Sequence, residues 1–284
     1  MLRRLVLLCL FVCLPIAQAA PPVQSWWLDN GTRVYYIGSE QLPMVDVQLV
    51  FDAAGARDGD LPGLARLTNA MMSEGAGGRS AEEISLGFER LGAEFDSQSL
   101  KDMSVFSLRS LVEPDKLDEA VALLSDVLGK PDFPADAFER LRKQMLAALD
   151  AEAQSPRAIV NREFFKALYG DHPYAQPAQG TRESIERMTL EDIRAFYRHY
   201  MVGKNAVVAI VGDLDLIEAS RLAERITAGL APGEAAPALP KPEPLAESRT
   251  IRIHHPSTQT HIMTGQVGIA RADLDLFSLY VGNH

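Results

Sequence analysis

The side chains that could hold a metal ion in this chain are histidines, and their spacing argues against a metal site. The candidates are His172, His199, His254, His255 and His261. Two histidines bind one zinc ion readily when they lie four residues apart on a helix, and no two of these do. His254 and His255 are adjacent, and neighbouring residues on a strand point to opposite faces. We expect structural or surface roles for these two and a loop-structuring role for His172.

Carboxylates that could act as acid and base lie on two expected helices and read as solvated charges. The residues are Glu82, Glu83 and Glu89 on a helix over 81–91, and Glu139, Asp150 and Glu152 on a helix over 135–153. Such side chains are seldom buried unless paired. A nucleotide site is not indicated either: no G-x-G-x-x-G follows Gly212, and the glycine-rich stretch 75–80 lacks the Lys-Ser/Thr of a phosphate loop.

The stretch 61–80, LPGLARLTNAMMSEGAGGRS, positions the residues with the clearest chemical pattern. Its apolar residues fall at helical spacing, and glycines 75, 77 and 78 end the helix. Ser80 and Glu83 form a capping-box pattern for the helix that follows. On this helix, Arg66, Asn69 and Ala70 occupy positions i, i+3 and i+4, the spacing at which two histidines and a glutamate would form a zinc site.

The surrounding sequence resembles that of the M16 metallopeptidases, the family of insulinase, pitrilysin and the mitochondrial processing peptidase. The similar segments are GAR before Gly63, LGAEFDSQSLKDMSVFSLRSL over 91–111, GDHPYAQPAQGT over 170–181, and the helix start at Thr189. In that family a glycine and two residues precede H-x-x-E-H, and here Arg66, Asn69 and Ala70 replace the three functional residues. The resemblance implies a third ligand, a Glu, near 145–150. We therefore predict no catalytic residue, metal or cofactor in this chain, with zinc left to catalytic relatives or a partner.

Residues 1–19 read as a signal peptide, with Arg3 and Arg4, an apolar run, and Ala17-Gln18-Ala19 as the cleavage site. An N-terminal anchor is the alternative. Both cysteines, Cys9 and Cys13, fall in this segment, so the mature chain has no disulfide. We expect a periplasmic or otherwise exported protein with no stable membrane anchor after cleavage. The net charge of −10 without a basic patch argues against nucleic-acid binding.

The remaining sequence predicts an α+β fold of the M16 type, with a mixed, largely antiparallel sheet packed against helices, plus the start of a second similar half. Expected strands are 25–28 and 32–37 around Asn30-Gly31, then 44–51, 93–99, 103–111 and 206–211. We divide the chain into a first domain over 24–230, a Pro/Ala-rich linker over 231–247, and a truncated second domain over 248–284. In this last part we expect strands at 249–253 and 259–266 and a helix at 273–283.

Three functions are compatible with this reading. The first is a non-catalytic M16 subunit that forms a heterodimer with a catalytic M16 chain and contacts a peptide or unfolded protein substrate. The second is an active zinc endopeptidase with unconventional ligands, for which the scattered histidines would have to serve. The third is a periplasmic peptide-binding or chaperone module without a peptidase partner.

Overall fold

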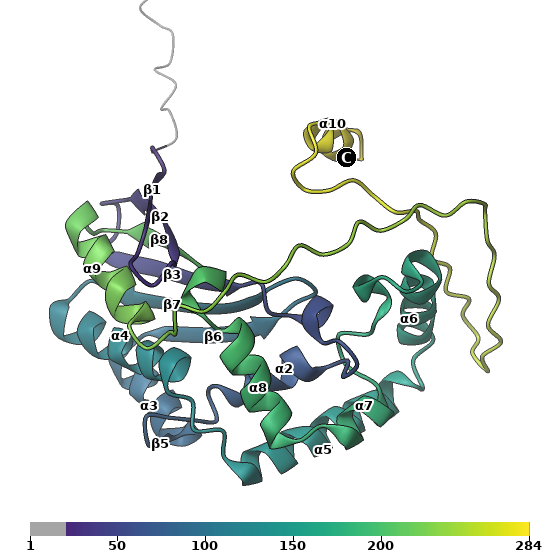
Figure 1. Ribbon diagram of the computed structural model, residues 1–284, viewed down its shortest axis with the longest axis horizontal. Helices are drawn as coiled ribbons and strands as arrows, with labels where there is room; N and C mark the ends of the chain where they lie inside the picture. The colour runs from purple at the N-terminus through teal and green to yellow at the C-terminus, as the bar shows by residue number, and fades with distance from the viewer. Residues whose placement is uncertain (1–20, 284) are drawn as a thin grey trace, which may run out of the picture.

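The computed structural model describes residues 21–283, so the expected signal peptide at 1–19 lies outside the described residues. Within them, one six-stranded sheet and the helices packed on it form the body of the molecule (Figure 1). The expected α+β class is confirmed. No helix in the described part of the chain is long and apolar enough to cross a membrane.

The sheet has the strand order β1-β2-β8-β3-β7-β6. Its strands are β1 Gln24–Trp27, β2 Arg33–Gly38, β3 Met44–Phe51, β6 Glu94–Ser99, β7 Ser104–Leu111 and β8 Ala206–Gly212. All neighbours are antiparallel except β2 and β8, which run parallel. A short ribbon pairs β4 Gly75–Ala76 with β5 Arg79–Ser80. The expected hairpin at Asn30-Gly31 joins β1 to β2.

The alternation of side chains gives the sheet one buried and one open face. Val47, Leu49, Phe106, Val208 and Ile210 point to the buried face and are at most 2% exposed. Their neighbours along each strand are partly or fully exposed, so the opposite face is not covered by a helix layer. We call this second surface the open face.

Helices cover the buried face and extend beyond one end of the sheet. They are α2 Leu64–Met71, α3 Ala81–Leu91, α4 Pro114–Gly129, α5 Ala135–Glu152, α6 Pro156–Tyr169, α7 Arg182–Arg187, α8 Leu190–Tyr200 and α9 Leu216–Thr227. The last described helix, α10 Leu276–Gly282, lies apart from them at the end of the C-terminal segment. Helix α4 packs on β7, α9 packs on β2, and α4 and α9 pack on each other. Figure 1 shows α5, α6 and α7 gathered at the end far from α9.

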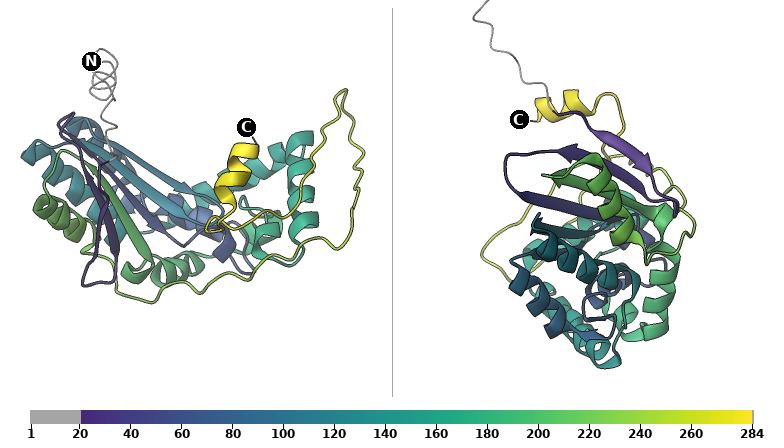
Figure 2. Two further views of the ribbon diagram at one scale, coloured as in Figure 1. Left: turned by 90° about the horizontal axis from the view of Figure 1, so that it is seen from above. Right: turned by 90° about the vertical axis from the view of Figure 1, so that its left-hand side faces the viewer.

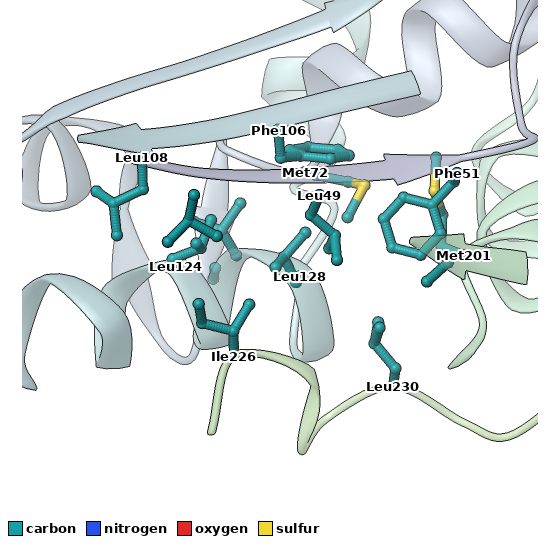
Figure 3. Packing of buried hydrophobic residues seen from close by; sticks show 14 of the residues in the cluster. Leu49, Phe51, Met72, Phe106, Leu108, Leu124, Leu128, Met201, Ile226 and Leu230 are labelled. Atoms are coloured by element: carbon teal, nitrogen blue, oxygen red, sulfur yellow. The ribbon is translucent and has the colours of Figure 1, made fainter. Parts of the chain in front are cut away.

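The core lies between the sheet and α4 and α9. Figure 3 shows Leu49 and Phe106 of the strands facing Leu124 and Leu128 of α4. All four side chains are fully buried. Burial of each such side chain is worth about 1.5–3 kcal/mol relative to exposure, so this layer holds the sheet and helices together.

Four helix starts are fixed by reciprocal side-chain caps. Capping boxes occur at Ser80, Thr181, Thr189 and Asp215, before α3, α7, α8 and α9. The Ser80–Glu83 box and the Thr189 start agree with the sequence patterns. Each box satisfies backbone N–H groups that the first helical turn leaves without a partner.

The chain after α9 differs from the expectation. No strand is present at 249–253 or 259–266, and α10 is shorter than the helix expected at 273–283. Strands need a partner for their backbone groups, and no described segment lies in register beside these residues. Figure 2 shows this segment as an extended trace that leads to α10. It is attached to the body near its start by an ion pair of Lys204 with Glu234, 3.0 Å long, and by the Ala236 N–H, which donates to Asn205 Oδ1.

Candidate functional site at helix α2

Helix α2 begins on a buried carboxylate. Asp58 is 4% exposed, and its two oxygens accept hydrogen bonds from the backbone N–H groups of Gly63 (2.6 Å) and Ala65 (2.7 Å). Gly63 is the N-cap residue with φ of 94°, a left-handed conformation that glycine adopts without strain. The Asp58 side chain therefore caps helix α2, although it lies five residues before the N-cap position Gly63.

The environment of Asp58 shifts the pKa of its carboxyl group toward neutral pH. Burial raises the pKa of the Asp58 carboxyl to about 7, although the hydrogen bonds from Ala65 and Gly63 and the nearby charge of Lys101 act in the opposite direction. Burial also lowers the pKa of the Lys101 ammonium, against the attraction of Asp58. The start of α2 thus contains a carboxyl and an ammonium that affect each other's protonation.

Lys101 links three loops around the start of α2. Its Nζ donates to the carbonyl oxygens of Gln176 (2.6 Å) and Tyr174 (3.3 Å), and its own carbonyl accepts from the Ala56 N–H (2.8 Å). Burial and a hydrogen bond to Asp102 raise the pKa of Tyr174 to about 12, so this phenol stays protonated. The loop before α2, the β6–β7 turn and the 174–176 loop are therefore held as one unit.

The three positions with zinc-motif spacing carry no zinc ligand. Arg66 is exposed, Ala70 is partly buried, and Asn69 is 3% exposed. The Asn69 side chain donates from Nδ2 to the Gln98 carbonyl of β6 at 3.3 Å. A guanidinium, an amide engaged with the backbone and a methyl group do not supply the imidazole or carboxylate donors that zinc requires. We still predict, from their spacing after Gly63, that these residues replace the family's zinc motif.

The histidines are dispersed. His172 lies in the loop after α6, where its Nδ1 accepts from the Tyr174 N–H (3.1 Å) and its Nε2 is 2.9 Å from the Pro240 carbonyl, so the ring structures this loop. His199 is exposed on α8, and His254 and His261 are exposed in the C-terminal segment. His255 Nδ1 is buried without a hydrogen-bond partner. Among residues 21–283, no three His, Cys, Asp or Glu side chains are grouped so that they could hold a metal ion.

Three of the helix carboxylates are engaged by other groups. Glu83 accepts from the Ser80 N–H in the capping box, Glu139 pairs with Arg142 at 2.7 Å, and Asp150 pairs with Arg182. Glu152 is only partly buried at the end of α5. None of them belongs to a group of three metal-ligating side chains in the part of the chain that the structure describes.

Sequence reasoning missed Asp58 and Lys101. Aspartate is a typical N-cap residue, but Asp58 lies farther before α2 in the sequence than the capping residue of a known motif does. Only the turn formed by Gly59 to Pro62 brings the carboxylate back over the first helical turn. Lys101 carries no sequence signal, because its partners are backbone carbonyls of a distant loop.

Comparison with known proteins agrees with this architecture. Residues 33–182 match the family described as insulinase, peptidase family M16, and residues 187–284 match the M16 inactive domain. The chain belongs to the M16 peptidase family. The family assignment expected from the sequence is confirmed, and it accounts for the mixed sheet with α2 beside its β6 edge.

Relatives within the M16 family include proteins described as inactive. A non-peptidase homolog from Helicobacter pylori, YmxG, is 29% identical over 186 residues, which are 64% of this chain and 42% of the relative. The crystal structure of an M16 inactive domain from Pseudomonas fluorescens is 41% identical with a TM-score of 0.77, covering 78% of this chain and 54% of that one. The periplasmic protease PqqL from Escherichia coli, at 20% identity, shares the fold with a TM-score of 0.68, covering 78% and 26%. The chain spans about half the length of the curated M16 relatives it matches.

Asn69→Glu would place a glutamate at the helix position that the spacing predicts for the glutamate of the M16 zinc motif. We expect the free energy of unfolding to fall by about 3 kcal/mol, because a buried carboxylate would face the Gln98 carbonyl without a cation. Urea unfolding measures the change. Arg66→His on the exposed side of the same helix is the control and should stay within about 0.5 kcal/mol. An equal midpoint for Asn69→Glu and the native protein would contradict the buried placement of this side chain.

Proposed function

We propose that this protein is a non-catalytic M16 subunit that pairs with a zinc-binding catalytic M16 chain in peptide or protein processing. One observation carries the proposal. The helix with zinc-motif spacing is present in the M16 fold, and its positions carry Arg66, Asn69 and Ala70 instead of metal ligands. The description of the Helicobacter relative as a non-peptidase homolog and of the Pseudomonas structure as an inactive domain supports the same reading.

The edge of the sheet offers a place for an extended peptide. Strand β6 is the last strand of the sheet, so its outer backbone groups have no strand partner in the described structure. Main-chain hydrogen bonds to such an edge bind a peptide without requiring a particular side chain. Asn69 is tied to this strand through Gln98, so a peptide on β6 would pass beside α2. The proposed contribution of this chain is peptide contact rather than hydrolysis.

We propose export as the setting of this function. The signal-peptide pattern at 1–19 supports it, and the Escherichia coli fold neighbour is a periplasmic protease. We further propose the division into a first domain at 24–230, a linker at 231–247 and the start of a second M16-like unit at 248–284. The prolines of the linker and the extended course of the chain after α9 support this division.

The decisive experiment measures zinc and peptidase activity of the mature protein, alone and mixed with a catalytic M16 chain from the same host. We expect substoichiometric zinc and no hydrolysis alone, and a higher rate in the mixture than with the catalytic chain by itself. The matched control uses a catalytic chain whose H-x-x-E-H glutamate is replaced by glutamine, which should give no activity in either case. One zinc per chain with activity alone, or no effect on any partner, would refute the proposal.

A further inference from the structure

The segment 231–242, which we call the strap, lies against the body of the molecule after α9. It contains prolines at positions 232, 237, 240 and 242. Within residues 234–244, only Ala236, Leu239 and Pro242 are partly buried, and all the others are exposed. Burial therefore recurs at every third residue. Figure 1 shows the chain after α9 as an extended trace that runs toward α6.

A period of three residues is the period of a polyproline II helix, which has three residues per turn and no internal hydrogen bonds. Proline fixes its own φ and restricts the residue before it to extended conformations, so this sequence favours that helix. Residues 231–244 form no α-helix or strand in the structure. One face of the strap thus contacts the body, and at about 3.1 Å per residue the stretch from Ala236 to Pro242 covers about 19 Å.

Gly233 turns the chain onto the body at the start of the strap. It has φ of +58°, a left-handed conformation that glycine adopts without strain. A Cβ at this position would lie 2.4 Å from the Cβ of Val202, so only glycine allows so close an approach. Two backbone hydrogen bonds from the body hold the chain just before this turn. They run from the Gly203 N–H to the Ala231 carbonyl (2.7 Å) and from the Lys204 N–H to the Pro232 carbonyl (3.0 Å).

Asn205 presents a buried acceptor to the strap. This residue is 8% exposed, and its Nδ2 donates to the carbonyl oxygens of Asp52 (3.0 Å) and Tyr200 (2.8 Å). These two acceptors fix the orientation of the amide, because only its NH₂ group can donate to them. Oδ1 then points to the strap and accepts from the Ala236 N–H at 3.0 Å. Without that donor a buried oxygen would lose its hydrogen bond, so the body has a built acceptor for the strap backbone.

His172 holds the strap at its other end. Its Nδ1 accepts from the Tyr174 N–H (3.1 Å), which places the proton of the neutral ring on Nε2. Nε2 then donates to the Pro240 carbonyl at 2.9 Å. The ring lies in an aromatic cluster, with its centre 4.7 Å from that of Tyr174 and 5.8 Å from that of Tyr169. Aromatic side chains together with a donor to a backbone carbonyl are typical of surfaces that bind polyproline II segments.

We propose that the surface between Asn205 and His172 is a binding site for a polyproline II segment, and that the strap occupies it and stabilises the loops around the start of α2. The connection to α2 runs through hydrogen bonds. The Tyr174 carbonyl accepts from Lys101 Nζ at 3.3 Å, and the Lys101 carbonyl accepts from the Ala56 N–H at 2.8 Å. The inference does not depend on the proposed function, because it concerns contacts within one chain.

The strap has an advantage over any separate proline-rich peptide because it is tethered to the body beside its site. A short tether gives an effective concentration in the millimolar range without any additional contact. The site should therefore be filled by the strap in the native chain. A separate peptide should reach it only after a substitution has weakened the binding of the strap.

The first test uses the three-residue period of the strap in the full chain. Leu239→Glu places a charge on the face that contacts the body, and Ala238→Glu, the matched control, places the same charge on the neighbouring exposed residue. Hydrogen exchange of the Ala236 amide reports whether the strap is bound, since this N–H donates to Asn205. We expect exchange about tenfold or more faster in Leu239→Glu and within about twofold of native in Ala238→Glu. Equal rates in the two variants would overturn the proposed binding of the strap.

The same variants test the connection to α2. The Ala175 and Gln176 amides donate within the loop after α6, and the Ala56 amide donates to the Lys101 carbonyl. In Leu239→Glu we expect all three amides to exchange several-fold faster, while the amides of α9 serve as the internal reference and keep their native rates. A strap that is released while these three rates stay native would show that it does not stabilise the loops around α2.

A separate peptide tests the binding site itself. The probe is an acetylated, amidated peptide with the sequence of residues 234–244, EAAPALPKPEP. Added at a few millimolar to the Leu239→Glu chain, it should restore slow exchange of the Ala175 and Gln176 amides, because it then supplies at least the effective concentration of the lost tether. The same peptide with its leucine replaced by glutamate is the control and should restore nothing. Failure of the unmodified peptide, or equal rescue by both peptides, would overturn the site. No measurement here involves a peptidase, so this result and the test of the proposed function can fail separately.

Discussion

Replacing Gly180 with alanine should lower the free energy of unfolding by at least about 3 kcal/mol. Gly180 has φ of +87°, where an L-residue costs about 1–2 kcal/mol. A Cβ at this position would lie 2.6 Å from the Pro62 carbonyl oxygen and 3.1 Å from Ile185, and relief of such overpacking costs about 1–3 kcal/mol more. The close approach holds the 176–181 loop against the start of α2, and urea unfolding measures its loss.

Gly92→Ala is the matched control for this prediction. Gly92 ends α3 with φ of +64°, and nothing lies within 4 Å of a Cβ added there. We expect it to lose only about 1–2 kcal/mol, the cost of the left-handed conformation. If both variants lose the same stability, the contact between Gly180 and Pro62 has no energetic importance.

Asp58→Ala should lower the free energy of unfolding by about 2–4 kcal/mol. The substitution leaves the Gly63 and Ala65 N–H groups without an acceptor, and each unpaired buried donor costs about 1–3 kcal/mol. The loss should be concentrated at α2, because the carboxylate is its cap. Hydrogen exchange of the α2 amides, with those of α9 as the internal reference, would show it. Uniform loss of protection in both helices would contradict a local role.

The same carboxyl gives stability a pH dependence of definite sign. Its pKa is about 7 in the folded protein and near 4 when unfolded, so between these values the folded state keeps a proton that the unfolded state has lost. Stability contributed by Asp58 is therefore complete below about pH 4 and decreases as the pH rises to about 7, by about 4 kcal/mol at most. Above that pH it is constant.

Asp58→Asn isolates this effect because asparagine does not titrate. The difference in unfolding free energy between the native protein and Asp58→Asn should shrink as the pH is raised from 5 to 8, when measured by urea unfolding at each pH. A difference that stays constant over this range would mean that the folded carboxyl is already ionised at pH 5 and that the cap acts as an anion.

The sequence was sufficient for the elements whose pattern is local. The Asn30-Gly31 hairpin, the alternation of 44–51 and the Ser80 capping box each depend on neighbours within a few residues, and all three are present. The family resemblance gave the sheet type and the position of α2. The strands expected at 249–253 and 259–266 failed because alternation alone cannot form a strand without a partner.

The features missed at the candidate site depend on distant parts of the chain. Lys101 is held by carbonyls of residues 174 and 176. No local pattern encodes this contact. The positions of Arg66, Asn69 and Ala70 were named from spacing, but the hydrogen bond of Asn69 to β6 needed the tertiary structure.

The parallel pairing of β2 with β8 determines when this chain can fold. Arg33 pairs with Val207, 207 − 33 = 174 positions later, and β8 lies between β2 and β3. At a synthesis rate of about 5–20 residues per second, β2 waits on the order of 10–30 s for its neighbour. Until then the sheet consists of two separate pieces, and closing so long a loop makes completion slow. The topology thus delays completion of the sheet until β8 has been made.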